Sequence, residues 1–423
     1  MANTDREFSS MLNEYLPDEL LMEELIKRDY FLTQIAKDED WKGGDAIVPF
    51  RGAQASSIKF GGLTASNDIA QSKYVRGKIQ GYKEVWGSLI FNEADLVQHD
   101  GGKVHEGSFL KILPDEIEDF SDNFKEVVSH QLGCGGAMAT VTDATNAATG
   151  KMIVDRIDRF IIRQKLTLDD GNSATVSVYV TAIDVNTNEV TVSATRDGSA
   201  LDVSAYTVAQ GAKFYYDGSW DGTNFDSFLS LRKALLSAAN GGDATLHGQT
   251  KLAYPYLQAI NINGGVGGLA ISATNILDKL FDAYTTIRTK ARGKATDIVM
   301  SYKHLGSIMK LLQTVQGAYR AVNEPNHTQY GWTEITIAQV GSGQVLKVVG
   351  VQEMDDDVIF FIDWSTIKFL SNGGFRKRRG PDGENYFVIR NTTGYQYVID
   401  TCLYGDMKYV KPSNNGVIHS ISY

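Results

Sequence analysis

The sequence predicts an α+β fold, in which a mixed core of helices and strands carries separate strand-rich segments. Three observations support this class. Apolar residues recur at helical spacing over 114–132, they alternate at period two over 174–194, and short apolar strands alternate with helical segments between 273 and 370. At roughly 150 residues per domain, 423 residues allow about three domains or one fold with insertions.

Composition and charge exclude several classes of protein. Hydrophobic residues make up 43% of the chain and charged residues 22%, as in folded globular proteins and not in disordered ones. The net charge of −10 argues against a protein whose main task is to hold DNA, because phosphate binding requires an excess of Lys and Arg.

Cysteine usage and hydropathy indicate the compartment. Cys134 and Cys402 form no CxxC motif, so we expect neither a disulfide framework nor a zinc site, and synthesis in a reducing compartment. The N-terminus has no apolar signal region, and no run reaches about 18 apolar residues. We therefore expect neither a secretory signal nor a transmembrane helix.

The first forty residues are predicted to be helical. Pro17, followed by Asp18 and Glu19, marks a helix start, because acidic side chains favour the positive end of the helix dipole. Apolar residues from Leu20 to Ile35 form a broad face. An ordinary amphipathic surface helix and an N-terminal arm are both compatible with this pattern.

A long polar β-hairpin is predicted next. The run AIVPF at 46–50 begins an extended segment, and residues 51–80 are rich in Gly, Ala, Ser, Lys and Gln. A segment with so few large apolar residues buries little within its own subunit, so its length indicates a functional arm. Alternation over 73–80 predicts a returning strand, and the apolar residues 82–91 are expected to re-enter the core.

A long one-sided helix is predicted to start at Pro114, with Asp115 and Glu116 in its first turn. Its apolar stripe comprises Ile117, Phe120, Phe124, Val127 or Val128, and Leu132. The glycine-rich residues 133–139 are expected to end this helix, although small residues also permit another backbone to approach closely.

The remaining chain is predicted to alternate strands and helices. Residues 153–216 are strand-like, with a hairpin of 174–183 and 189–194 around a turn, which predicts a small β insertion. Helices are expected at 227–239, 273–292 and 302–312, and a buried strand at 297–301. The final hundred residues are expected to be mostly strands, among them 345–350, 357–362, 366–370 and 386–389.

No catalytic, cofactor or metal motif is present. The glycine-rich run at 264–268 lacks the lysine of a phosphate-binding loop, and neither HExxH nor GxSxG occurs. The seven histidines have no metal-ligand spacing, and His99 and His105 are expected to be exposed in a connector. The sequence therefore predicts a protein that is not an enzyme and binds no cofactor or metal.

Two charged clusters have more than one interpretation. The acidic run at 355–357 lacks the spaced oxygen ligands of a calcium loop, so we expect a turn before a strand. The basic run at 376–379 lies between glycines, where either a solvated turn or a contact is possible. As a contact it would bind nucleic acid or, in our preferred hypothesis, another subunit.

The order of these elements resembles the tailed-bacteriophage major capsid fold, which is shared with the herpesvirus capsid floor and with encapsulins. The run TDIVMSY at 296–302 before a helix, and VVGVQ at 348–352 before DVIFFID at 357–363, are similar to segments of that family. The resemblance implies an N-terminal arm at 1–45, an extended loop at 46–91, a peripheral domain with a spine helix at 92–158, a β-rich insertion at 159–216, a continued peripheral domain at 217–251, an axial domain at 252–368 and C-terminal strands at 369–423.

The same resemblance implies a structural role. The protein would self-assemble as pentamers and hexamers into an icosahedral shell around a phage genome, in the cytoplasm of a host bacterium. A separate scaffolding protein, a portal protein and decoration proteins are implied partners, with weak non-specific contact to double-stranded DNA and none to membranes. An encapsulin-type compartment, a tail adhesin with a glycan-binding β segment at 159–216, and an enzyme with a novel site are the alternatives.

Contacts between subunits are expected at residues of the hairpin and of the basic run. These are Lys59, Phe60, Leu63, Lys73, Tyr74, Arg76, Lys78, Arg376, Lys377, Arg378 and Arg379. Some relatives join subunits by a Lys–Asn isopeptide bond. No partner Asn or assisting acid can be identified for the hairpin lysines, so cross-linking is not predicted.

Overall fold

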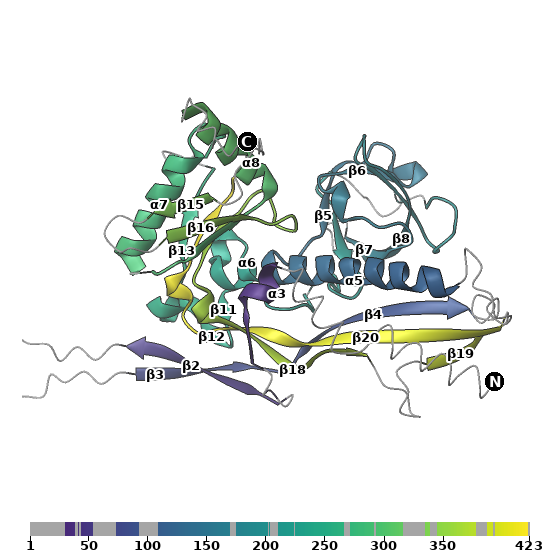
Figure 1. Cartoon of the computed structure of the whole chain (residues 1–423), viewed down its shortest axis with the longest axis horizontal. Helices are drawn as coiled ribbons and strands as arrows, with labels where there is room; N and C mark the ends of the chain where they lie inside the picture. Colours follow the sequence, from purple (N-terminus) through teal and green to yellow (C-terminus); the bar gives the residue numbers. More distant parts are fainter. Residues whose placement is uncertain are drawn as a thin grey trace, which may run out of the picture. The chain divides into compact units, whose positions relative to one another are not determined.

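The computed structural model describes residues 30–38, 41, 44–53, 73–92, 109–169, 175–201, 203, 210–223, 225–265, 271–291, 293–315, 335–338, 345–377, 387–391 and 394–421. Within this part the chain forms two compact units (Figure 1). Unit 1 contains Lys83–Leu229 and Phe375–Leu403, and unit 2 contains Ile26–Tyr82, Ser230–Gly374 and Tyr404–Tyr423. Helices and strands are mixed in both units, which confirms the predicted α+β class.

In unit 1, helix α5 (Phe109–Gly133) packs against strand β4 (Lys83–Asn92). The contact depends on Gly87, because a Cβ atom there would lie 2.5 Å from the ring of Phe120 and 3.0 Å from that of Phe124. Strand β4 pairs with β20 (Gly394–Tyr409), where Ser88 Oγ donates a hydrogen bond of 2.6 Å to Asp400. Strand β20 also pairs antiparallel with β19 (Phe387–Asn391).

The start of α5 corrects the sequence prediction. The helix begins at Phe109, so Pro114 lies within it, and the acids after Pro114 do not form its first turn. The apolar stripe is confirmed where side chains are described, because Phe124, Val128 and Leu132 are buried. The predicted end is also confirmed at Gly133, which is followed by glycines with positive φ at 135 and 136.

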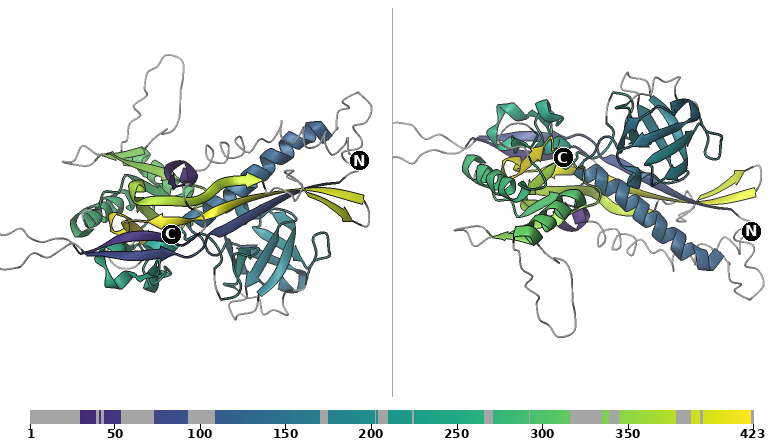
Figure 2. Two further views of the ribbon diagram at one scale, coloured as in Figure 1. Left: turned by 90° about the horizontal axis from the view of Figure 1, so that it is seen from below. Right: turned by 90° about the horizontal axis from the view of Figure 1, so that it is seen from above.

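Six antiparallel strands in the described part of unit 1 close into a barrel, in the order β10-β5-β6-β9-β8-β7. Figure 2 shows this barrel from two further directions. The strands are β5 (Ala139–Asp143), β6 (Lys151–Val154), β7 (Lys165–Asp169), β8 (Thr175–Asp184), β9 (Glu189–Ser193) and β10 (Lys213–Tyr216).

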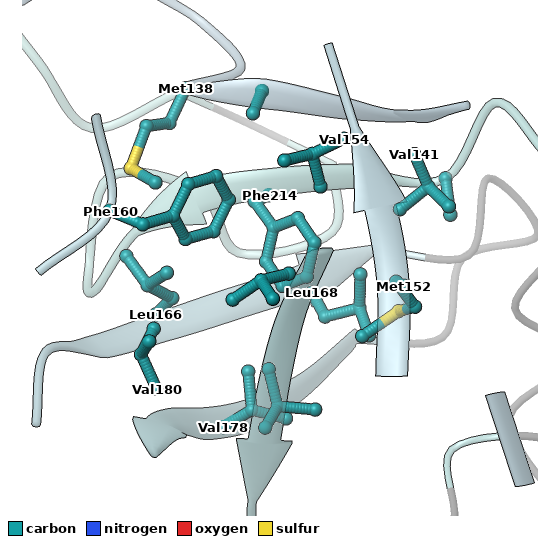
Figure 3. Close-up of a cluster of buried hydrophobic side chains, with 14 of the residues drawn as sticks. Met138, Val141, Met152, Val154, Phe160, Leu166, Leu168, Val178, Val180 and Phe214 are labelled. Atoms are coloured by element: carbon teal, nitrogen blue, oxygen red, sulfur yellow. The ribbon is translucent and has the colours of Figure 1, made fainter. Parts of the chain in front are cut away.

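The barrel starts earlier in the chain than the β-rich insertion predicted at 159–216. Strands β5 and β6 belong to it, although each is too short to show a clear alternation in the sequence. Its interior is filled by buried side chains that point toward one another from the surrounding strands (Figure 3). Those labelled are Met138, Val141, Met152, Val154, Phe160, Leu166, Leu168, Val178, Val180 and Phe214.

Unit 2 contains a mixed sheet of six described strands in the order β13-β21-β17-β14-β16-β15. Its pairs β13–β21 and β14–β16 are parallel, and the other neighbours are antiparallel. The strands are β13 (Ile260–Asn263), β14 (Asp297–Met300), β15 (Ile335–Ala338), β16 (Val345–Gly350), β17 (Ile359–Ile362) and β21 (Gly416–His419).

Three of the described helices of unit 2 lie between residues 231 and 315. Helices α7 (Ile276–Ala291) and α8 (Tyr302–Val315) pack on the sheet and confirm two predicted helices. Helix α6 (Leu231–Leu235) is shorter than the helix predicted at 227–239, because the chain turns extended at Leu236. Among the described helices, none combines the length and the apolar character that a membrane span requires.

The N-terminal part of unit 2 departs from the predicted long helix. Helix α3 (Tyr30–Gln34) is followed by strand β1 (Ala36–Asp38), which pairs parallel with β18 (Ile367–Lys377). The helix prediction is therefore wrong from Ala36 onward, because a strand distant in sequence supplies backbone partners. Residues 1–29, which carry the predicted helix start, lie outside the described part.

Candidate inter-subunit surface at the β2–β3 hairpin

The predicted hairpin is present as strands β2 (Ala46–Ala53) and β3 (Lys73–Ile79), labelled in Figure 1. They pair antiparallel from Ala46 opposite Ile79 to Ala53 opposite Lys73. In the described part of the chain neither strand pairs with a third. A two-stranded ribbon is marginally stable alone, so packing against the rest of unit 2 must hold it.

The two faces of the hairpin differ sharply in burial. Val48 and Phe50 are 0% and 1% exposed on the inner face, whereas Ile47 and Tyr74 are 60% and 63% exposed on the outer face. Residues paired across an antiparallel ribbon share a face. The outer face therefore carries a band of apolar and basic side chains, which we call the hairpin surface: Ile47, Pro49, Tyr74, Arg76 and Lys78.

His247 holds the inner face of the hairpin in place. Its ring stacks on Phe50 at 5.9 Å between centroids and on Tyr409 at 6.2 Å. Its backbone carbonyl accepts a hydrogen bond of 2.8 Å from the N–H of Lys78, and its Nε2 accepts one of 3.1 Å from the N–H of Tyr409. One histidine therefore joins β3, the inner face of β2 and strand β20.

A small second hairpin presents this histidine. Strands β11 (Thr245–Leu246) and β12 (Gln249–Thr250) pair across a turn in which His247 and Gly248 both have positive φ, 48° and 77°. Two such residues are typical of the tight turn that suits the twist of β-hairpins. The side chain of Gln249 also donates to the carbonyl of Arg76 at 2.9 Å, so this small hairpin supports the base of the large one.

Gly77 allows the two hairpins to approach. A Cβ atom there would lie 2.3 Å from the ring of Phe50 and 3.1 Å from the Cβ of His247. No side chain larger than that of glycine fits this position without movement of the Phe50 ring and of His247.

Burial also sets the charge state of His247. Desolvation, together with the nearby Lys408, lowers the pKa of His247 from 6.5 to about 4. The ring is therefore neutral at pH 7, and its Nε2 is free of a proton and able to accept from Tyr409. Sequence reasoning missed this residue, because His-Gly is not one of the dipeptides that mark a turn and the flanking strands have only two residues each.

The structure describes the positions of only some of the predicted contact residues. Tyr74, Arg76 and Lys78 lie together on the outer face of β3, and Lys78 pairs with Asp45 at 2.6 Å. Both side chains of that pair are about half exposed, so it contributes little to stability. For Lys73 only the backbone is described, and Lys59, Phe60 and Leu63 lie outside the described part.

The first two residues of the basic run at 376–379 lie in a strand and not in the predicted turn. Arg376 and Lys377 are the last two residues of strand β18, which continues through Gly373 and Gly374. Their side chains, and residues Arg378 and Arg379, lie outside what the structure describes. Arg376 and Lys377 fall in unit 1, whereas the hairpin belongs to unit 2.

The acidic run at 355–357 is a turn before β17, as predicted. Two of its carboxylates form ion pairs with one arginine: Arg232 donates to Asp355 at 3.0 Å and to Asp357 at 2.9 Å and 2.6 Å. Among the described residues, no group of three or more His, Cys, Asp or Glu side chains is placed to hold a metal ion.

No family model matches this sequence, and no curated protein matches it either. Solved structures with similar folds include the capsid of cyanophage A-1(L), with 11% identity, a TM-score of 0.47, and coverage of 92% of this chain and 91% of that one. The capsid of the native GTA particle has 10% identity, a TM-score of 0.47 and coverage of 92% and 90%. The capsid of Myoviridae phage XM1 has 9% identity, a TM-score of 0.40 and coverage of 93% and 91%.

Proposed function

We propose that this protein is a major capsid protein, which self-assembles into the icosahedral shell that encloses a phage genome. The observation that carries the proposal is the β2–β3 hairpin. Its inner face is fixed to unit 2 through His247, while its outer face presents apolar and basic side chains to solvent. Such an arm is suited to lie on another copy of the chain.

The energetics favour an intermolecular contact for this surface. Ile47 and Tyr74 are each more than half exposed, and burying a large apolar side chain contributes roughly 1.5–3 kcal/mol. Because the base of the hairpin is already fixed, little further ordering of the described strands is needed when a partner binds. Burial of these two side chains against a second molecule would therefore contribute free energy that their own subunit does not supply.

A shell requires many such contacts. One chain must meet its neighbours in rings of five and six, and extended arms accommodate these non-equivalent positions better than one rigid patch. Each contact is modest, but several contacts per subunit make a closed shell hard to leave. The net charge of −10 is consistent with weak, non-specific contact to packaged double-stranded DNA.

The proposal includes partners and a place of assembly. We place assembly in the host bacterial cytoplasm, with a separate scaffolding protein and a portal protein, and with decoration proteins on the finished shell. The protein has a structural and not an enzymatic role in this account. An encapsulin-type compartment would use the same arm, and particle contents distinguish the two, since a capsid holds DNA and an encapsulin holds a protein cargo.

Expression of the chain alone tests the proposal. Sedimentation velocity and negative-stain microscopy of the purified protein should show capsomer rings or shells. A variant that lacks residues 60–71 should remain a folded monomer, with the circular dichroism and melting temperature of the intact chain, because the arm that reaches the neighbour is shortened. Normal particles from this deletion variant would contradict the role of the arm, and a monomeric intact chain at every concentration would contradict the proposed function.

A further inference from the structure

The turn that follows β12 reverses the usual burial of its side chains. Lys251 is only 6% exposed, whereas its neighbour Leu252 is 85% exposed, more than any other large apolar side chain in the described part. Ala253 and Pro255, in the same pair of 3₁₀ turns (Lys251–Ala253 and Pro255–Leu257), are also exposed. We call these three exposed residues, Leu252, Ala253 and Pro255, the Leu252 turn.

Lys251 is tied down by the end of helix α6. Its Nζ donates to the carbonyls of Lys233 at 2.8 Å and Leu236 at 2.9 Å at the C-terminal end of the helix, where the Lys233 carbonyl also accepts from the N–H of Asp243 at 3.0 Å. Burial lowers the pKa of Lys251 to about 8, and the nearby Asp243 opposes that change. The fold therefore carries the cost of desolvating a lysine in order to fix this turn.

The backbone on both sides of Leu252 is also held. The N–H of Lys251 donates to Ala244 at 3.0 Å, and the side chain of Gln258 donates to the carbonyl of Lys251 at 3.0 Å. Leu257 is completely buried at the other end. The exposed leucine therefore lies on a rigid support, and a partner that covers it would not have to order the turn first.

Single exposed apolar residues are common and need no explanation. Here the neighbouring residue in the chain is a buried lysine, so a local rearrangement that exchanged the two side chains would bury a leucine and hydrate an ammonium group. The turn is instead fixed in the arrangement that exposes the leucine. We propose that the Leu252 turn is a second contact surface for another copy of this chain.

This inference rests on the proposed function, and two observations favour a copy of the chain as the occupant. The turn at Pro255–Leu257 lies against strand β2, so the Leu252 turn is continuous with the hairpin. The hairpin surface carries the exposed basic side chain of Arg76 beside the Lys78–Asp45 ion pair, whereas the whole chain carries a charge of −10 and can supply an acidic partner surface. The area of three side chains is far below the roughly 800 Å² per partner that a stable interface buries. The Leu252 turn must therefore be one part of a larger interface with the same neighbouring subunit.

Cysteine protection tests the contact directly. The natural cysteines are buried at 0% and 1% exposure, so a new cysteine at 252 should dominate the reaction with a maleimide. L252C should react quickly in the monomer and at least tenfold more slowly in particles assembled from the purified chain. V185C is the matched control, because Val185 is 70% exposed on the barrel and should react equally in both states.

Equal reactivity of L252C in monomers and particles would overturn the inference. Protection that arises only in particles isolated from the host together with another protein would assign the surface to that protein and would also overturn it. These outcomes leave the proposed function intact, since both require particles. An intact chain that never assembles contradicts the proposed function, and the Leu252 contact with it.

A charged residue at position 252 measures how much the Leu252 turn contributes to assembly. L252D should raise the concentration at which assembly begins by about tenfold or more, because an apolar contact is lost in every subunit. Its melting temperature should match that of the intact chain, since the side chain touches little within its own subunit. Assembly of L252D at the normal threshold, with V185D as the control, would contradict the contact.

Discussion

The barrel of unit 1 and the β2–β3 hairpin of unit 2 are both antiparallel, but they differ in how many partners each strand has and in which faces are covered. Every barrel strand pairs with two others, and the interior is filled by side chains of the same segment. In the described part of the hairpin, each strand pairs with one other and only the inner face is covered. The comparison separates a region whose stability is local from a region whose outer face is available for another molecule.

The largest effect on stability is expected in the barrel. Phe214 is completely buried, and its ring lies edge-on to Phe160 at 5.2 Å between centroids. Phe214→Ala should lower the free energy of unfolding by about 3–5 kcal/mol, because it removes apolar contacts and leaves a cavity. Urea denaturation followed by fluorescence measures the change. The control Val185→Ala should stay within about 0.5 kcal/mol, and equal effects of the two substitutions would refute a packed barrel interior.

Acid should weaken the hairpin more than the barrel. His247 binds a proton less readily in the folded chain, where its pKa is about 4, than in the unfolded chain, where it is near 6.5. Its contribution to stability is therefore complete above pH 6.5 and is lost as the pH falls toward 4, by up to about 3 kcal/mol. Urea denaturation across this pH range measures the loss.

The control for this prediction is His247→Asn, because Asn tolerates a positive φ and does not titrate. Burial also lowers the pKa values of His304 and His419, so some acid sensitivity should remain in this variant. Only the difference between the two pH profiles belongs to His247. Identical pH profiles for the intact chain and for His247→Asn would show that protonation of His247 does not cause the loss of stability.

A smaller loss is expected from Gly77→Ala at the contact between the two hairpins. The added Cβ would press on Phe50 and His247, and overpacking of this kind costs about 1–3 kcal/mol. Thermal unfolding of this variant should be compared with that of Gly44→Ala, whose Cβ would meet nothing within 4 Å. Equal melting temperatures for the two variants would mean that the hairpin base is not closely packed.

The smallest effect on stability should accompany a clear effect on assembly. Ile47→Ser and Val185→Ser each replace a residue that is more than half exposed, and both should change the free energy of unfolding by only about 0.5 kcal/mol or less. Ile47→Ser should nevertheless raise the assembly threshold severalfold, because it changes the hairpin surface. Light scattering over a concentration series measures that threshold, and equal thresholds for both variants would remove the distinction between hairpin and barrel.

Local periodicity predicted the elements whose burial is one-sided or complete. The strands at 46–50 and 73–80, helices α7 and α8 and strand β14 were all evident, because their apolar residues follow the spacing of the element. Tyr74, Arg76 and Lys78, which the sequence analysis names as contacts between subunits, are exposed on β3, and their role as contacts stays a prediction.

Features that depend on partners distant in sequence could not be predicted in this way. Strand β1 exists because β18 pairs with it, and the role of His247 arises from Phe50 and Tyr409, which lie far from it along the chain. The sixteen-residue strand β20 was not identified individually, because Gly405 and nearby charged residues interrupt its alternation. The reversed burial of Lys251 and Leu252 contradicts any prediction from hydropathy alone.

The central claim is that the outer face of the hairpin is completed by another copy of the chain. Sedimentation velocity of the double variant Ile47→Asp/Tyr74→Asp, beside the intact chain at matched concentrations, tests it most directly. We predict that the intact chain forms capsomers or shells, while the double variant stays a folded monomer with an unchanged melting temperature. Assembly of the double variant at the same concentration as the intact chain would contradict the claim.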